Sequence, residues 1–154
     1  MTPAELPGRL NRLADEVRDR AALAAADAMA QSYQSSVVRS MRGPSPSAPG
    51  TPPGRRTGTL ARSVRAEPAQ GGGGTATSSV APHTVYARIQ QFGGDIYPVR
   101  AKILHWKDKG GDHWARHVHL PERPYMVMTS GRRSQVRDAG VAAVRRVIRE
   151  ALGG

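Results

Sequence analysis

The chain has 154 residues and a net charge of +11, a length that suits one domain and is short for two substantial ones. It contains no cysteine, which excludes disulfides, thiolate metal sites and cysteine nucleophiles. Apolar residues make up 38% of the chain and aromatic residues only 5%, so the core must be built mostly from Val, Leu, Ile and Ala. A core this thin favours burial against neighbouring subunits, because a small domain buries little surface alone.

The positive charge is distributed along the chain. Residues 1–42, 43–83, 84–128 and 129–154 carry +1, +3, +3 and +4. A sequence-reading DNA-binding protein would concentrate its charge on one element. The charge leaves open nonspecific contact with DNA or with an acidic protein surface.

The first segment has the pattern of a long amphipathic helix. Apolar residues recur every three or four positions, at Leu6, Leu10, Leu13, Val17, Ala21, Ala24 and Ala28. No Pro or Gly lies between Gly8 and Gly43, so we predict one helix over residues 1–42. At ~1.5 Å per residue such a helix approaches ~50 Å, more than this domain can cover. Part of it should pack on another subunit, and the alternative is a solvated helix with a frayed end.

A proline-rich segment follows, and after it a glycine-tipped hairpin. Residues 43–56 contain five prolines and three glycines, a composition that predicts a loop. Residues 63–66 and 75–80 are compatible with strands, and the four glycines 71–74 between them predict the tip of a hairpin.

A second hairpin is predicted further along. Residues 103–107 and 113–120 flank the turn-forming segment 108–112. Alternation along the two strands predicts that Trp106 and Trp114 meet on the core side of a small sheet.

The last segment, residues 129–154, is predicted to be a helix packed on this sheet. Its apolar stripe is Val141, Val144, Ile148 and Leu152. Its arginines are candidate contacts for a partner or for DNA: Arg132, Arg133, Arg137, Arg145 and Arg149. The predicted fold is therefore α+β, a single domain over residues 1–154 with a long N-terminal helix, a mostly antiparallel sheet region with hairpins over 57–128, and a C-terminal helix.

Catalytic and metal-binding signals are weak. His117 and His119 lie two apart and would share one face of a strand, with His113 nearby, but no carboxylate within that stretch completes a ligand set. There is no Gly-x-Ser-x-Gly nucleophile motif, and the glycine run lacks the Lys-Ser/Thr of a phosphate loop. We predict a non-enzymatic protein without cofactor or metal, and a metal-dependent hydrolase stays the least favoured alternative. No stretch approaches the ~18 apolar residues of a membrane span.

Three collinear motifs over residues 57–126 carry a resemblance. Residues 57–64, Thr-Gly-Thr-Leu-Ala-Arg-Ser-Val, resemble a Thr-Gly-x-Leu-x-x-Ser-Ile/Val signature. Residues 86–93, from Tyr86 to Gly93, are similar to Tyr-Ala-x-x-x-x-Phe-Gly, and residues 121–126 to Pro-x-Arg-Pro-Phe-Met/Leu with Tyr125 in place of Phe. Together they resemble the bacteriophage tail-completion and head-tail joining proteins, in the virion-morphogenesis group of Mu-like and lambdoid phages.

The resemblance implies a structural subunit of a ring, usually six-fold, between the head connector and the tail tube. The implied partners are further copies of the chain, head-connector proteins and tail-terminator or tail-tube proteins, with nonspecific contact to packaged DNA, in a virion neck assembled in the host cytoplasm. The motif residues are Thr57, Gly58, Leu60, Ser63, Tyr86, Phe92, Gly93, Arg123, Pro124 and Tyr125. The alternative function is a basic module that binds nucleic acid nonspecifically.

The chemistry of the motif residues is structural. Thr57 can cap a short helix that carries Leu60 on one face. Tyr86 and Phe92 are the aromatic residues that a thin core needs. Pro124 can occupy the first turn of a helix, and a planar Arg guanidinium can bind a carboxylate or carbonyl.

Overall fold

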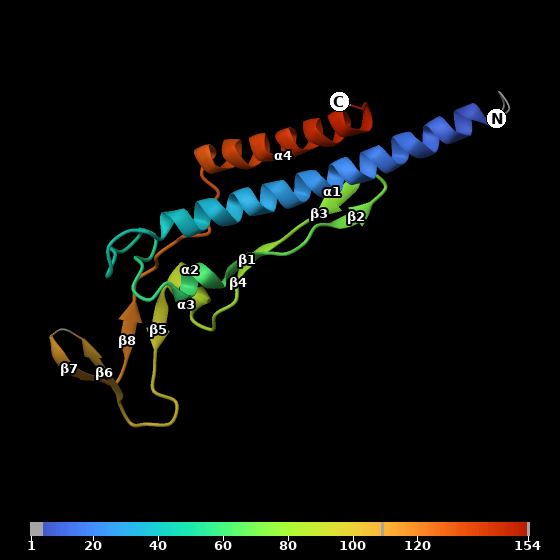
Figure 1. Ribbon diagram of the computed structural model, residues 1–154. Helices are drawn as coiled ribbons and strands as arrows, with labels where there is room; N and C mark the ends of the chain where they lie inside the picture. Colours follow the sequence, from blue (N-terminus) through green and yellow to red (C-terminus); the bar gives the residue numbers. More distant parts are fainter. Residues whose placement is uncertain (1–4, 109, 154) are drawn as a thin grey trace.

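The computed structural model describes residues 5–108 and 110–153 and confirms an α+β fold. Two helices, α1 (Leu6–Ser40) and α4 (Ser130–Ala151), lie side by side, and the small helices and strands lie along α1 and beyond one of its ends (Figure 1). The remaining elements are α2 (Thr59–Ser63), β1 (Val64–Ala66), β2 (Gln70–Gly72), β3 (Thr75–Thr77), β4 (Val80–Pro82), α3 (Ala87–Phe92), β5 (Gly94–Ile96), β6 (Leu104–Asp108), β7 (Gly111–Ala115) and β8 (Val118–Leu120).

The long N-terminal helix is confirmed. α1 runs for 35 residues without interruption, because Pro7 lies in its first turn, where no helical hydrogen bond is lost, and alanines fill much of its middle. It ends at Ser40, and the C-cap Met41 lies shortly before the proline-rich loop. No helix among the described residues is long and apolar enough to cross a membrane.

α4 packs against α1, and the expected packing on the sheet is wrong. The side chains that α4 buries are small, namely Ala143 and Val147 next to Gly140. A Cβ atom on Gly140 would lie 2.7 Å from the sulfur of Met29, so the two helices approach closely at this point. Small residues allow this approach, and they set which face of α4 turns inward.

The stripe predicted for α4 consequently faces outward. Val141 and Ile148 are 43% and 44% exposed, Leu152 is 82% exposed, and Val144 is half-buried. The periodicity of these apolar residues is helical, as predicted, but it marks the outer face of α4.

The first hairpin is confirmed and runs along α1. β1 pairs with β4 and β2 pairs with β3, both antiparallel, and the chain reverses at the glycines between β2 and β3. Side chains of α1 hold the hairpin: Asp27 accepts the backbone N–H of Ala69 at 2.6 Å, and Asp19 accepts that of Gly74 at 2.5 Å.

The second hairpin is shorter than predicted. β6 pairs with β7 only, and β8 pairs with β5, so that His119 lies opposite Asp95. The described strands form four separate two-stranded ladders in place of one small sheet. On β6 and β7, Trp106 and Trp114 are 40% and 61% exposed. Their predicted place in the core is therefore wrong.

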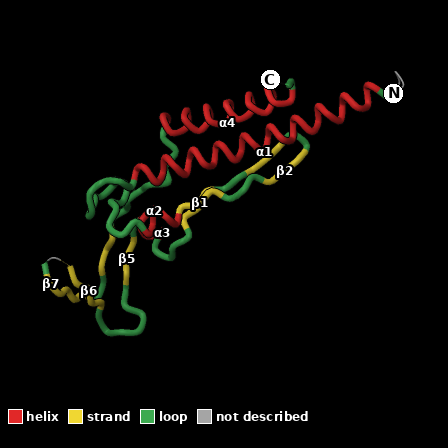
Figure 2. The backbone as a smooth tube through the Cα atoms, in the orientation of Figure 1, coloured by secondary structure: helices red, strands yellow, loops and turns green. Residues whose placement is uncertain are grey.

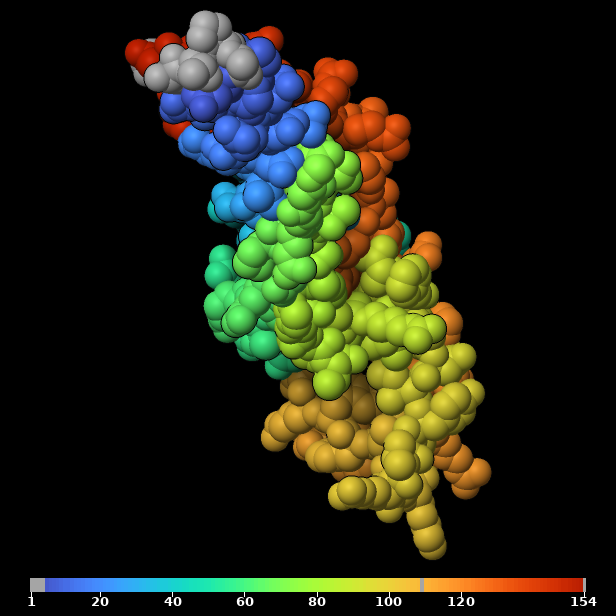
Figure 3. Space-filling model, turned by 90° about the vertical axis from the view of Figure 1, so that its right-hand side faces the viewer, coloured from blue at the N-terminus to red at the C-terminus, as the bar shows by residue number. Residues whose placement is uncertain are grey.

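The elements β5 to β8 and the loop between β5 and β6, residues 94–120, form a projection that we call the distal arm (Figure 2). In the space-filling view it makes up the yellow and orange end of an elongated molecule, and the first turns of α1 lie at the opposite end (Figure 3).

The main apolar cluster lies where α1, α2 and the segment before α4 meet. It consists of Val37, Met41, Ala61, Val64 and Tyr125. Tyr125 is the aromatic residue in this core. Tyr86, at 38% exposure, and Phe92, at 70%, lie outside it, so the core positions expected for them are wrong.

Candidate functional site

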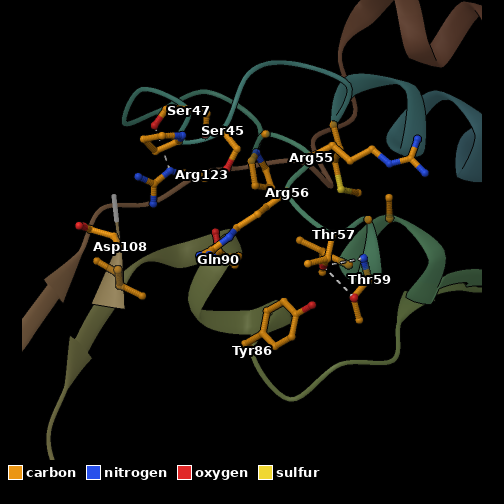
Figure 4. A pocket seen from close by; sticks show the side chains of 18 of the residues that line it. Ser45, Ser47, Arg55, Arg56, Thr57, Thr59, Tyr86, Gln90, Asp108 and Arg123 are labelled. Atoms are coloured by element: carbon orange, nitrogen blue, oxygen red, sulfur yellow. Dashed lines mark hydrogen bonds between the residues drawn. The ribbon is translucent and has the colours of Figure 1, made fainter. Parts of the chain in front are cut away.

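A wide hollow of about 1510 Å³ lies between the proline-rich loop, α2, α3 and the β6–β7 hairpin. Figure 4 shows the loop residues Ser45, Ser47 and Arg56 on one side of it and Tyr86 and Gln90 on another. Segments far apart in the sequence build this hollow, and residues of all three motifs line it.

The proline-rich loop is fixed by hydrogen bonds to the segment that precedes α4. The guanidinium of Arg123 donates to the carbonyl oxygen of Ser47 at 3.2 Å, and the N–H of Gly50 donates to the carbonyl of Glu122 at 2.9 Å. The N–H of Arg123 in turn donates to the carbonyl of Gln90 at 2.9 Å. Arg123 therefore binds a carbonyl, as its motif position predicts, and links the loop to α3.

The side-chain amide of Gln91 binds the backbone of the third motif. The side-chain oxygen of Gln91 accepts the backbone N–H groups of both Tyr125 and Met126 at 3.0 Å. The Tyr125 hydroxyl donates to the carbonyl of Ala87 at 3.3 Å. Burial raises the pKa of Tyr125 to about 12, so this hydroxyl stays protonated and keeps its hydrogen bond. Gln91 occupies one of the unspecified positions of the second motif, so the motif pattern gives no signal of this role.

Pro124 does not begin a helix. The segment from Pro121 to Tyr125 is irregular, and α4 begins at Ser130 behind the N-cap Thr129, whose side chain accepts the N–H of Arg132. The first-turn position suggested for Pro124 is therefore wrong, whereas the helix predicted over residues 129–154 begins as expected.

Arg132 is bound within the chain. Its guanidinium donates to the carbonyls of Tyr125 at 3.1 Å and Ser36 at 3.4 Å, and also to that of Val127. It lies 5.7 Å from the centre of the Tyr33 ring, and the Tyr33 hydroxyl donates to the carbonyl of Met126 at 2.9 Å. Arg132 thus joins α4, α1 and the third motif.

Two motif glycines are required by backbone geometry. Gly58 has φ +78, is buried, and precedes α2 as its N-cap; a Cβ there would lie 2.9 Å from the guanidinium atoms of Arg55 and Arg62. Gly93 has φ +67, and a Cβ would lie 2.7 Å from backbone atoms of Leu120 and Glu122. Residues with a Cβ atom disfavour the backbone conformation at both positions, so the path of the backbone explains the two glycines.

The capping role expected for Thr57 is met only loosely. The N-cap of α2 is Gly58, which has no side chain to accept a capping hydrogen bond. The hydroxyl oxygen of Thr57, one residue earlier, accepts the N–H of Thr59 at 3.4 Å. Ser63 at the other end of α2 donates its hydroxyl to the carbonyl of Leu60 at 2.8 Å.

Apolar and neutral polar residues make up most of the lining of the hollow, and its charged side chains are mostly basic. The lining includes Arg55, Arg56, Lys107 and Arg123. The carboxylate Asp108 also lines it, and hydrogen bonds from His113 and from the N–H of Gly110 hold the pKa of Asp108 below its usual value. A surface of this composition can accept acidic or amphipathic protein segments.

The distal arm pairs histidines with carboxylates. His117 and His119 both contact one oxygen of Asp95, at 3.1 and 2.9 Å, and His105 contacts Asp112 at 2.9 Å. Hydrogen bonds from His119 and His117 lower the pKa of Asp95. Among the described residues, no group of three or more such side chains is arranged to hold a metal ion.

The predicted site residues therefore fall into separate places. Five of them line the hollow: Thr57, Gly58, Leu60, Tyr86 and Arg123. Five others do not line the hollow but lie within three residues of a lining residue in the sequence: Ser63, Phe92, Gly93, Pro124 and Tyr125. Four arginines of α4 lie exposed on another surface, away from the hollow: Arg133, Arg137, Arg145 and Arg149.

Residues 4–93, more than half of the chain, match the family described as "Bacteriophage HK97-gp10, putative tail-component". The chain belongs to this family. The matched region runs from α1 through α3 and contains the first two motifs, including the part of the hollow built by α2 and α3. No curated protein and no solved structure matches the chain. As a tail component, the protein is a structural part of the virion.

Proposed function

We propose that this protein is a subunit of a closed ring, six-fold in symmetry, that joins the head connector to the tail tube at the phage neck. Its partners in this proposal are further copies of the chain, the adjoining connector proteins and the tail-terminator or tail-tube proteins. Family membership supports the tail assignment, and the surface of the subunit supports the joining role.

The observation that carries the proposal is the exposure of large apolar side chains at both ends of an elongated subunit. Leu10 and Leu13 are 56% and 54% exposed on the first turns of α1. At the other end, Val99 is 96% and Trp114 61% exposed on the distal arm. Apolar patches of this kind mark interaction surfaces in soluble proteins. A subunit with two such ends is suited to bind a neighbouring copy at one end and an adjoining assembly at the other.

The hollow adds a third surface. It gathers the motif residues around a basic and apolar space, which suits an acidic segment from an adjoining neck protein. In this proposal the family motifs maintain a docking space.

Removing the gene tests the joining role. We expect lysates with filled heads and separate tails and with unimpaired DNA replication, seen by electron microscopy and by measuring phage DNA. A normal yield of joined virions from the deletion mutant would overturn the proposal.

Contact with packaged DNA is a second candidate function, favoured by the exposed arginines of α4, which carries six arginines and two carboxylates. Retention of the purified protein on DNA should then fall steeply with salt, because each phosphate contact releases a counterion. Replacing Arg133, Arg137, Arg145 and Arg149 by Gln should reduce both the retention and its salt dependence. Unchanged retention in this variant would exclude α4 as the DNA-binding surface.

A further inference from the structure

Two exposed apolar stripes lie on the two long helices. The first, which we call the α1 stripe, consists of Leu6, Leu10, Leu13 and Val17. Its three leucines are 44%, 56% and 54% exposed. The second, the α4 stripe, consists of Val141, Val144, Ile148 and Leu152. These side chains therefore keep apolar surface that is buried neither between α1 and α4 nor in the core.

The two stripes match in spacing. Successive positions lie 0, 4, 7 and 11 residues from Leu6 in the α1 stripe, and 0, 3, 7 and 11 residues from Val141 in the α4 stripe. Each stripe therefore extends over roughly 16 Å of helix at ~1.5 Å per residue. Steps of three and four residues are also the spacing by which two helices pack side chains into each other along a seam.

The α1 stripe is accessible to a second helix. The ion pair between Arg20 and Glu150, at 3.7 Å, places the end of α4 near the fifth turn of α1. The turns that carry Leu6, Leu10 and Leu13 project beyond that point (Figure 1). A helix from another copy can lie against them without displacing α4.

Charge decides which stripes can pair. Residues 5–20 contain four acidic and four basic residues, whereas α4 has six arginines against two carboxylates. Two α4 stripes face to face would bring Arg145 and Arg149 of both copies together, which is unfavourable. The neutral α1 segment, with the carboxylate of Glu16 next to Val17, is the compatible partner for the arginine-flanked α4 stripe.

We infer that the α1 stripe of one subunit packs against the α4 stripe of the next copy of this chain. This inference rests on the proposed ring and specifies its interface. Such a contact joins two different surfaces, so each subunit still has one free surface of each kind after binding one neighbour. Contacts of this type continue from subunit to subunit until the ring closes.

The absence of cysteine from the chain allows a direct test by engineered disulfides. Two double variants distinguish the direction of packing: Leu10→Cys with Ile148→Cys for antiparallel helices, and Leu13→Cys with Ile148→Cys for parallel ones. Each would be supplied in the cell to a phage that lacks the gene, and the virions would be oxidised and run on a non-reducing gel. We expect one of the two variants to give a ladder of covalent oligomers that ends at the size of the ring.

The controls separate this interface from the others. Each single cysteine variant should stay monomeric; a dimer from Leu10→Cys or Leu13→Cys alone would show that two α1 stripes pair and would overturn the inference. Val85→Cys with Ile148→Cys places one thiol at a fully exposed site away from both stripes and should give no ladder. Joined virions without a ladder from either double variant would overturn this interface while leaving the joining function standing. If the deletion mutant itself produced joined virions, the proposed function would fail.

Discussion

The helical part of the molecule and the distal arm are stabilised in different ways. α1 and α4 bury small side chains along their contact, and the cluster around Val64 and Tyr125 closes one end of it. In the described residues of the arm, 94–108 and 110–120, no residue is buried, and backbone ladders and His–Asp hydrogen bonds hold the strands. The helical part should therefore respond to changes in packing, and the arm to changes in backbone geometry and pH.

The largest difference between the two parts is expected from a buried carboxylate. Val64→Asp places an unpaired charge at a position that is 1% exposed, which should cost several kcal/mol of unfolding free energy. Val99→Asp makes the same change in the arm at a position that is 96% exposed and should cost almost nothing. Urea unfolding curves of both variants measure this, and equal midpoints would mean that the core is misplaced.

Loss of the Arg132 guanidinium should come next. Arg132→Ala leaves three carbonyl groups without a charged donor, and it should lower the unfolding free energy by about 1.5 to 3 kcal/mol. Arg133→Ala, on the next and exposed position of α4, is the matched control and should be close to neutral. Thermal unfolding of the two variants compares them, and a stable Arg132→Ala protein would contradict the structural role.

A substitution that strains the backbone should destabilise the arm and leave the helices unchanged. Gly93→Ala introduces a Cβ into a backbone conformation with φ +67 and against backbone atoms of Leu120 and Glu122, at a cost of about 1 to 3 kcal/mol. Amide hydrogen exchange should become faster in β5 and β8 and stay unchanged in α1. The same substitution at Gly131, where a Cβ meets open space, serves as the control. Faster exchange in both regions would mean that arm and helices unfold as one unit.

The smallest effect concerns pH. The pKa of Asp95 is lowered in the folded arm, so its stabilising contribution is complete above its ordinary value of 3.8 and is lost as the pH falls through the lowered value. NMR signals of β5 and β8 should therefore show a transition in this acidic range that reports on Asp95. Asp95→Asn should abolish this transition. A transition that persists in the variant would have to come from another carboxylate.

The histidines of the arm provide a related prediction. Replacing His113, His117 and His119 together by Gln should leave virion assembly intact, because the contacts of these side chains are exposed hydrogen bonds to carboxylates within the arm. The measurement is the titre of a phage that carries the triple variant. A loss of assembly accompanied by loss of a bound metal would revive the metal-site alternative.

The sequence predicted the elements better than it predicted their contacts. Long-range periodicity and the Pro-rich and Gly-rich segments marked α1, α4 and the first hairpin, because these signals are local. The inner face of α4 was missed, since its contact depends on Gly140 and Ala143, whose small size carries no hydrophobic signal. Ile148 and Leu152, the largest apolar residues of the predicted stripe, lie outside because the close helix approach leaves no room for them.

At the candidate site, too, the sequence predicted which residues take part better than it predicted their contacts. The motifs identified the residues that surround the hollow, but the pattern could not show which aromatic residue is buried. Tyr125 enters the core because Gln91 binds the two backbone N–H groups at residues 125 and 126, a contact between distant segments. Phe92, on the last turn of the short helix α3, faces outward instead.

The antiparallel course of α1 and α4 gives the subunit a polarity. The beginning of α1 and the end of α4 lie toward one end of the helical pair, and the distal arm lies beyond the other (Figure 1). An electron-dense tag fused at either chain end would therefore mark the same end of the molecule and leave the arm unlabelled. In images of a joined virion, the height of that tag relative to the capsid would show which way the subunit points, toward the head or toward the tail.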